Sequence, residues 1–218
     1  LPNSLPPIAM PLLRAHYDQA ALKQPFTTQS RKGGYGGYSL TSATGCVTDG
    51  WVGAGGLMHQ RQADGSYAKV ANPQATQAAH NILPLSQYDQ PTAICTGIAV
   101  QVLDFLKAIA KQPIYRSRYG VHRAGQRLGW HVDGIRQAGI WRIHLPMLSE
   151  SGARFCWRSP SGQVIEQHLK ADGTIYFTRI DVEHGLVNES DADRVHLHTM
   201  TAHPINPVQL GAQAVCGF

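Results

Sequence analysis

The stretch GTIYFTRIDVEHGLVNESDADRVHLHTMT, residues 173–201, contains three short runs of strand-forming residues separated by turn-forming ones. The runs lie at 174–179, 184–188 and 194–201, and a turn signal, Ala171-Asp172-Gly173, precedes the first of them. Short runs bounded by Gly, Asp, Asn and Ser predict β-strands. No helix-length segment separates the runs, so the stretch favours an all-β arrangement over βαβ units.

The same pattern extends upstream as far as residue 114. Further strands are predicted at 114–122, 127–132, 140–147, 154–158 and 163–169. The segments Arg123-Ala124-Gly125 and Pro160-Ser161-Gly162 supply turns between them. Several short strands at regular spacing with such turns predict a sandwich or a barrel.

The N-terminal half predicts helices around a glycine-rich segment. One helix is expected around 11–23, and a second at 93–111, which ends before Gln112-Pro113 as a helix should. Apolar residues of the second helix recur at helical spacing, while Asp104 and Lys107 interrupt its apolar run. This pattern indicates an amphipathic core helix and not a membrane span.

The glycine-rich segment at 31–56 does not predict a nucleotide site. It contains neither a G-x-x-x-x-G-K-[ST] nor a G-x-G-x-x-G pattern, which phosphate loops require. It favours hairpins, with YSLTS at 38–42 as a strand, or a mobile flap over a substrate at 33–56.

Composition and charge exclude several classes of protein. The chain has 218 residues, 43% of them apolar and 15% charged, so it is long enough for a core and too apolar to be disordered. The net charge is +5, but the longest basic cluster is Arg31-Lys32, so no nucleic-acid partner is expected. No membrane partner is expected either, and the sequence leaves the oligomeric state open.

The cysteines and the N-terminus predict a cytoplasmic protein. Cys46, Cys95, Cys156 and Cys216 are far apart and form no C-x-x-C pair, so they are expected to be buried thiols in a reducing compartment. The N-terminus lacks the charged and apolar regions of a signal peptide.

A candidate metal motif lies in GWHVDG, residues 129–134. In a strand, the side chains of His131 and Asp133 point to the same face, because strand side chains repeat every two residues. His184 follows a predicted strand and precedes Gly185, which permits close backbone approach. Two histidines and one carboxylate on one side of a metal leave positions open and are typical of non-haem Fe(II) oxygenases.

A further arginine fits the chemistry that such a metal site supports. An α-keto acid that chelates the metal needs an anchor for its far carboxylate, and a guanidinium is the best partner through a bidentate pair. Arg194 begins the next predicted strand, ten residues after His184. Each of these residues alone is most often an ordinary polar residue of the surface. Their order and spacing on predicted strands favour one site.

Four segments resemble the aspartyl/asparaginyl β-hydroxylase family of Fe(II)/2-oxoglutarate-dependent dioxygenases, which includes the bacterial proline cis-hydroxylases. They are YGVHRAGQRLGWHVDG (119–134), WRIHLPM (141–147), GTIYFTRIDVEHGLVNES (173–190) and DRVHLHTMTAHP (193–204). The resemblance covers about 115–204, less than half of the chain. The H-x-D aspartate, absent from mammalian-type members, places the sequence nearer the bacterial branch.

The resemblance implies a fold and a set of site residues. The fold would be mainly β with flanking helices, a double-stranded β-helix (a cupin-like jelly roll). His131, Asp133 and His184 would bind Fe(II), and Arg194 and His144 would contact the cosubstrate 2-oxoglutarate, with O2 as the other cosubstrate. The family often has a serine near the position of Gly120, for which His122 or Tyr119 could substitute.

The resemblance further implies hydroxylation of a C–H bond of a small carboxylate-bearing molecule, an amino acid or a derivative. The substrate contacts would come from Arg142, Arg118, Arg123 and Trp130. Two alternatives stay open, a peptide or protein side-chain hydroxylase of the same family and a cupin-like metal-binding β-barrel without oxygenase activity.

We expect residues 1–218 to form one oxygenase domain. Residues 1–112 would be an N-terminal helical and loop portion with the flap, residues 113–204 the β-helix core with the metal motif, and residues 205–218 a C-terminal tail.

Overall fold

The computed structural model describes residues 4–28, 34–49, 59–61, 67–69, 83–133, 141–201, 203 and 213–215. The two α-helices are α1 (Ala9–Lys23) and α3 (Ile98–Ala110), with a 3-10 turn η2 at Leu85–Gln87. The strands before α3 are β1 (Thr27–Thr28), β2 (Tyr35–Ser39), β3 (Thr41–Ser42), β4 (His59–Arg61), β5 (Tyr67–Lys69) and β6 (Gln90–Pro91). The strands after α3 are β7 (Ile114–His122), β8 (Arg127–His131), β9 (Trp141–Leu148), β10 (Ala153–Arg158), β11 (Val164–His168), β12 (Tyr176–Arg179), β13 (His184–Asn188), β14 (Arg194–Thr201) and β15 (Gln213–Val215).

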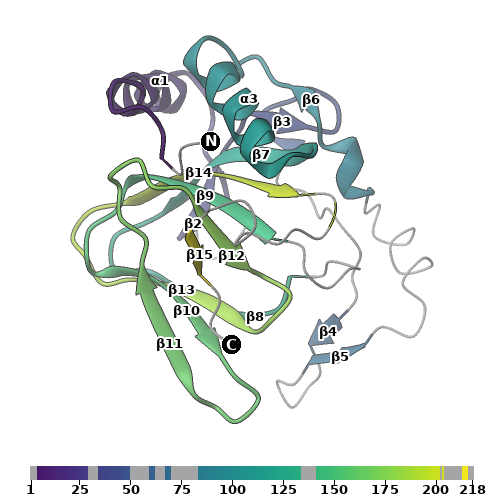
Figure 1. The fold of residues 1–218 in the computed structure, drawn as a ribbon, viewed down its shortest axis with the longest axis vertical. Coiled ribbons are helices and arrows are strands. Elements are labelled where there is room, and N and C mark those ends of the chain that lie inside the picture. Colours follow the sequence, from purple (N-terminus) through teal and green to yellow (C-terminus); the bar gives the residue numbers. More distant parts are fainter. Residues whose placement is uncertain are drawn as a thin grey trace.

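The strands from β7 to β14 form two sheets that face each other (Figure 1). The large sheet has the order β1-β2-β7-β14-β9-β12-β15, and the small sheet has the order β11-β10-β13-β8. The chain passes back and forth between the sheets, so that the first strand of the eight pairs with the last and the second pairs with the seventh. This strand order is that of a jelly roll, and the predicted double-stranded β-helix is confirmed.

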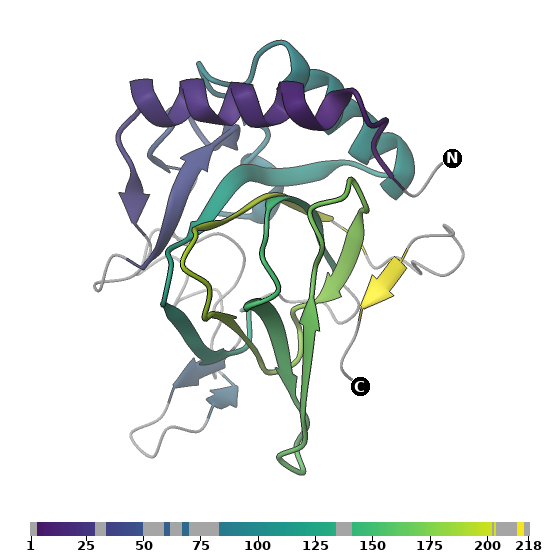
Figure 2. The same ribbon diagram turned by 90° about the vertical axis from the view of Figure 1, so that its left-hand side faces the viewer.

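Both helices pack on the outer face of the large sheet, as Figure 2 shows for α1. The core between helices and sheet includes Leu103 and Leu106 of α3 together with Val121, Ile143 and Leu197 of the sheet. Helix α3 begins at Ile98, after Gly97, whose φ of 51° is not helical, and it ends at Ala110. It therefore begins five residues and ends one residue inside the expected span 93–111. Among the described residues, no helix is long and apolar enough to cross a membrane.

The inner face of the large sheet is unusually polar. Strand β14 directs Val195 and Leu197 toward the helices, and its alternate residues Arg194, His196 and His198 are also fully or almost fully buried. Strands therefore alternate between an apolar face that packs on helices and a polar face that points between the sheets. Burial of so many polar groups costs free energy, and such groups persist where a site requires them.

Two segments outside the predicted core join the large sheet. Tyr35–Ser39, from the segment expected to form hairpins or a flap, is a buried strand that pairs with β7. Gln213–Val215, from the expected tail, pairs in parallel with β12. The predicted strand at 38–42 is thus only partly right, since β2 and β3 divide it. A flap is wrong for β2, because its backbone is hydrogen-bonded within the sheet, while residues 50–56 lie outside the described residues.

The thiols differ from the expectation of uniform burial. Cys156 is buried, Cys95 is half-buried and Cys46 is exposed, so the prediction is wrong for Cys46. Cys46 follows the short strand β3 in a turn at the surface, where its sulfur contacts Thr48. Cys216 lies outside the described residues.

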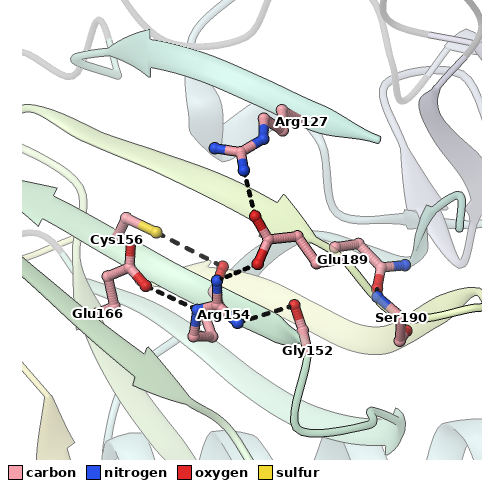
Figure 3. Close-up of polar contacts among 8 residues, drawn as sticks. Arg127, Gly152, Arg154, Cys156, Glu166, Glu189 and Ser190 are labelled. Atoms are coloured by element: carbon pink, nitrogen blue, oxygen red, sulfur yellow. Dashed lines mark hydrogen bonds and ion pairs between the residues drawn. The ribbon is translucent and has the colours of Figure 1, made fainter. Parts of the chain in front are cut away.

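The outer face of the small sheet carries a network of ion pairs (Figure 3). Arg154 donates to Glu166 at 2.7 Å and to Glu189 at 2.6 Å, and Arg127 pairs with the other oxygen of Glu189. Nearby, Arg158 forms two hydrogen bonds with Glu183. The guanidinium groups of Arg127, Arg154 and Arg158 therefore each lie beside a carboxylate that neutralises them.

Candidate metal centre

The two predicted histidine ligands lie opposite each other on neighbouring strands. His131 ends β8 and His184 begins β13, and the two are register partners in the small sheet. Their ring centroids are 4.3 Å apart. Pairing of the second and seventh strands of the jelly roll therefore brings together two histidines that are far apart in the sequence.

A β-bulge in β8 directs His131 inward. Leu128 pairs with Leu186 and His131 pairs with His184, so two residues of β8 face the single residue Gly185 of β13. A bulge of this kind re-aims the side chains that follow it. A Cβ at position 185 would lie 2.9 Å from the carbonyl oxygen of Leu128, so glycine is required where the strands approach, as predicted.

Asp133 joins the histidines by a different route from the one expected. The strand β8 ends at His131, so strand periodicity does not place Asp133. Its backbone N–H donates to the carbonyl of Ile180 at 3.1 Å, which holds the residue against the segment that leads to His184. Its carboxylate lies 3.7 Å from Nε2 of His131, and the ligand atoms of the three residues all lie within 4.8 Å of one another.

The hydrogen bonds of the two histidines leave the metal-facing nitrogens bare. Nδ1 of His131 contacts the carbonyl of Gly129 at 2.8 Å, and Nδ1 of His184 contacts the carbonyl of Val182 at 2.9 Å. A carbonyl only accepts, so each Nδ1 donates, and Nε2 is the ring nitrogen that each histidine can offer to a metal. Metal-binding histidines are commonly oriented in this way. Nε2 of His184 is buried and has no partner among the described residues.

The charge states of these residues suit a divalent cation. Burial lowers the pKa of His184 to about 4, which keeps its ring neutral near pH 7. Burial acts to raise the pKa of Asp133, but Arg142 first and then the two histidines outweigh it, so the carboxyl stays well below its usual range. Two imidazoles, of which that of His184 is neutral, and one carboxylate are donors that fit a first-row metal such as Fe(II).

A small cavity adjoins two of the ligands. It measures about 200 Å³ and is lined by Tyr35, Arg116, Arg118, Leu128, His131, Asp133 and Arg142. Arg142, a predicted substrate contact, pairs directly with Asp133. A larger hollow of about 720 Å³ lies between α3 and β7 and contains none of the predicted ligands.

The predicted cosubstrate residues lie in the interior, outside the lining of this cavity. Arg194 is 3% exposed, and its guanidinium donates to Nδ1 of His196 at 3.0 Å. Nδ1 of His144 lies 3.3 Å from the same nitrogen of His196. In the described part of the chain, no carboxylate forms an ion pair with Arg194. Burial, its largest influence, lowers the pKa of Arg194 to about 10, so it stays charged at neutral pH.

Two predicted substrate residues do not reach the cavity. Arg123 pairs with Asp193 and lies over the ring of Phe26, 4.6 Å from its centroid. The guanidinium of Arg158 lies over the ring of Trp130 at 4.8 Å. Neither Arg123 nor Trp130 lines the cavity. Their assignment to the substrate stays a prediction that no contact supports.

Glycine at position 120, near which the resemblance implies a serine, has a steric cause. A Cβ on Gly120 would lie 2.4 Å from Nε2 of His198, so a serine would displace this histidine. Tyr119 packs on the helix side of the sheet, and its hydroxyl contacts His16. His122 is buried, and burial first and then the charge of Arg194 lower its pKa to about 4. Of the two residues expected to replace the serine, His122 and Tyr119, His122 is the one that lies opposite Arg194 on the neighbouring strand.

Sequence reasoning missed the contributions of Tyr35, Leu128, His196 and His198. A signal for the histidines was present, since Arg194, His196 and His198 alternate with apolar residues along one strand. Alternation of this kind is equally typical of an ordinary strand with one face on the core. Tyr35 and Leu128 carried no signal, because a glycine-rich strand and a bulge place them.

Comparisons with known proteins give only distant structural likenesses. No known protein family matches the sequence, and no curated protein matches it. A cupin domain from Bordetella pertussis Tohama I is 21% identical over 39% of this chain and 78% of its own, with a TM-score of 0.30. An uncharacterized double-stranded β-helix protein from Klebsiella pneumoniae is 22% identical over 39% of this chain and 67% of its own, with a TM-score of 0.29.

A nickel complex of the non-haem monooxygenase ThoJ is 12% identical over 48% of this chain and 53% of its own, with a TM-score of 0.37. None of these structures is similar enough to carry a function to this chain. The fold rests on the strand order, and the function has to be inferred from the site.

Proposed function

We propose that the chain is an Fe(II)- and 2-oxoglutarate-dependent oxygenase that hydroxylates a C–H bond of a small carboxylate-bearing substrate. The observation that carries the proposal is the convergence of His131, Asp133 and His184 beside a cavity lined by three arginines. Perturbed ionisable residues gathered around a cavity are typical of functional sites.

The three ligands would hold Fe(II) on one side. With the metal bound, 2-oxoglutarate and O2 are converted to succinate and CO2, one oxygen atom entering succinate and the other the substrate C–H bond. The carbonyls of Gly129 and Val182 fix the histidine rings, and Arg142 fixes the carboxylate of Asp133. These contacts position the ligands before the metal arrives.

Arg194 is the proposed anchor for the far carboxylate of 2-oxoglutarate. Its planar guanidinium presents two parallel N–H groups to a carboxylate, which a lysine cannot do. Because His196 accepts one N–H of Arg194, the orientation of the remaining donors is restricted. His144 contacts His196, which in turn contacts the guanidinium of Arg194. His144 would therefore contact the cosubstrate beside Arg194.

Arg118 and Arg142 are the proposed contacts of the substrate, because both line the cavity next to His131 and Asp133. The cavity of about 200 Å³ is smaller than the roughly 300–1,000 Å³ of sites for drug-sized ligands. This size favours a small molecule over a peptide. The buried arginines of the lining argue against the alternative of a metal-binding barrel without oxygenase activity, because they have no evident role in such a protein.

The test is turnover of 2-oxoglutarate by the purified chain loaded anaerobically with Fe(II). On admission of air, we expect succinate to form in proportion to a hydroxylated product when small carboxylates are screened. Zn(II)-loaded protein serves as the control, because zinc occupies the same ligands without redox chemistry. Metal bound at the triad without succinate above the zinc control would favour the cupin-like alternative.

A further inference from the structure

Each of the two histidine ligands is oriented by its own stretch of backbone. Nδ1 of His131 contacts the carbonyl of Gly129, and Nδ1 of His184 contacts the carbonyl of Val182. In both cases the carbonyl belongs to the residue two positions upstream. The direction of each ring therefore depends on the one residue that lies between the histidine and this carbonyl.

The two residues in between, Trp130 and Glu183, share a contact with Arg158. The guanidinium of Arg158 lies over the ring of Trp130, 4.8 Å from its centroid. It also donates two hydrogen bonds to the carboxylate of Glu183, from Nε at 2.7 Å and from Nη2 at 2.5 Å. One side chain therefore connects the two segments that carry the histidine ligands.

The backbone of Arg158 holds the second of these segments as well. Its N–H donates to the carbonyl of Glu183 at 2.9 Å, and the preceding residue, Trp157, is the register partner of His184. Arg158 is the last residue of β10, so both contacts lie where this strand ends. The same residue thus fixes Glu183 through its main chain and through its side chain.

A glycine gives the ring of Trp130 its place on the outer face of the small sheet. A Cβ at position 185 would lie 3.6 Å from Cε3 of the ring, so the ring covers Gly185. Strand side chains alternate between faces, so His184 and Gly185 point to opposite sides of the sheet. Arg158 and its two partners lie behind the histidines, and none of the three is among the described residues that line the cavity.

The contacts of Arg158 are of a kind that fixes direction more than fold stability. The side chains of Arg158 and Glu183 are 36% and 26% exposed, and an ion pair at such exposure contributes little to stability. A planar guanidinium that binds both oxygens of a carboxylate and stacks on an aromatic ring nevertheless restricts the geometry of its partners. In metalloproteins, loss of groups that orient the ligands typically lowers metal affinity by about tenfold to a hundredfold.

We propose that Arg158 is a positioning residue of the metal centre. Through Trp130 and Glu183, it sets the directions in which the rings of the two histidine ligands point. The inference rests on the metal centre of the proposed function, but not on the reaction that the centre carries out. It also assigns Trp130 a role other than the predicted contact with substrate.

The test measures metal affinity without turnover. Co(II) is titrated into the metal-free chain under anaerobic conditions and followed through its visible absorption, which reports on the donors and their geometry. Arg158→Gln should lower the affinity for Co(II) by about tenfold to a hundredfold. Arg158→Lys keeps the charge but not the planar pair of donors, so it should retain only part of the affinity.

Arg154→Gln is the matched control. Arg154 lies on the same face of β10 and also contacts carboxylates, those of Glu166 and Glu189 (Figure 3). This variant should keep the affinity for Co(II) within about twofold of the wild-type value, and the urea midpoint of the metal-free protein should shift alike in both variants. A midpoint that falls much further in Arg158→Gln, with an affinity that follows the folded fraction, would show a merely structural role and overturn the proposal.

A double variant tests the route through Glu183. In a Glu183→Gln background, Arg158→Gln should lower the affinity for Co(II) by a smaller factor than in the wild-type chain, because the paired contact is already lost. An equal loss in both backgrounds, or an unchanged affinity in the single Arg158 variant, would contradict the proposal.

The result does not depend on the reaction. If Arg158→Gln weakens Co(II) binding as expected but the wild-type chain loaded with Fe(II) forms no succinate, the positioning role stands and the proposed oxygenase function fails. If the wild-type chain binds no Co(II), both the metal centre and the role of Arg158 are wrong.

Discussion

The arginines on the outer face of the small sheet and those between the two sheets have opposite surroundings. Outside, Arg154 contacts Glu166 and Glu189, and these contacts raise its pKa (Figure 3). Inside, burial and a neighbouring guanidinium lower the pKa of Arg118. The outer residues are neutralised by the fold itself, whereas the inner ones are held charged in an environment that disfavours their charge.

This difference in surroundings separates arginines that form ion pairs on the surface from arginines that are buried beside the candidate site. Exposed ion pairs contribute little to stability, so the outer network can be altered at small cost. Buried charge destabilises the fold unless it is compensated. Changes to the interior should therefore affect binding strongly, and changes to the outer network of Arg127 and Arg154 hardly at all.

The largest effect is expected from the metal ligands. His184→Ala removes the buried Nε2 that has no other partner among the described residues, so Fe(II) binding and succinate formation should fall to background. Metal content and 2-oxoglutarate turnover measure both. The exposed His203→Ala is the matched control and should leave both unchanged. Retention of stoichiometric iron by the His184 variant would remove this residue from the centre.

The second-largest effect is expected from acid, which should lower the free energy of unfolding. His122 has a pKa of about 4 in the folded chain, lowered by burial first, against about 6.5 when unfolded. As the pH falls below about 6.5, the unfolded state binds a proton that the folded state does not, so stability is lost. We expect about 2 kcal/mol from this residue between pH 7.5 and pH 5.

Urea unfolding of the metal-free protein at several pH values measures this loss, and His122→Gln should make the dependence less steep. An identical pH dependence in the variant would show that His122 does not remain neutral in the fold.

Arg194→Lys tests the cosubstrate anchor. The variant keeps the charge but loses the planar pair of donors, so the apparent affinity for 2-oxoglutarate should fall by roughly tenfold, about 1.5 kcal/mol. Anaerobic titration of the Fe(II) protein measures it without turnover. An unchanged affinity would assign the cosubstrate to another arginine, and those lining the cavity would then be tested first.

The smallest effect is expected on the outer face. Arg154→Gln removes a guanidinium from the ion-pair network, and the unfolding free energy should change by no more than about 1 kcal/mol, with turnover intact. Chemical denaturation at low and high salt measures it, since salt screens exposed pairs. A loss of several kcal/mol would show that this network supports the small sheet more than its exposure suggests.

Local pattern was sufficient for most elements of the fold. The predicted strand at 114–122 coincides with β7, and the strands at 184–188 and 194–201 coincide with β13 and β14, because turn residues bound each run. The resemblance supplied their arrangement as a jelly roll. Weak elements were lost, since β15 is three residues long and the glycine-rich β2 has little strand propensity.

The sequence by itself determined which residues could bind a metal, because His131, Asp133 and His184 carry the required donor atoms in a recognisable order. Only the tertiary structure decided how they meet. A bulge turns His131 inward, and a hydrogen bond to Ile180 brings in Asp133 beyond the end of the strand. Similarly, only the fold distinguished Arg116 and Arg118 from Arg123, which lie within eight residues of one another in the sequence. Bulges and cross-strand contacts depend on the partner strand, and a local sequence pattern contains no information about which strand that will be.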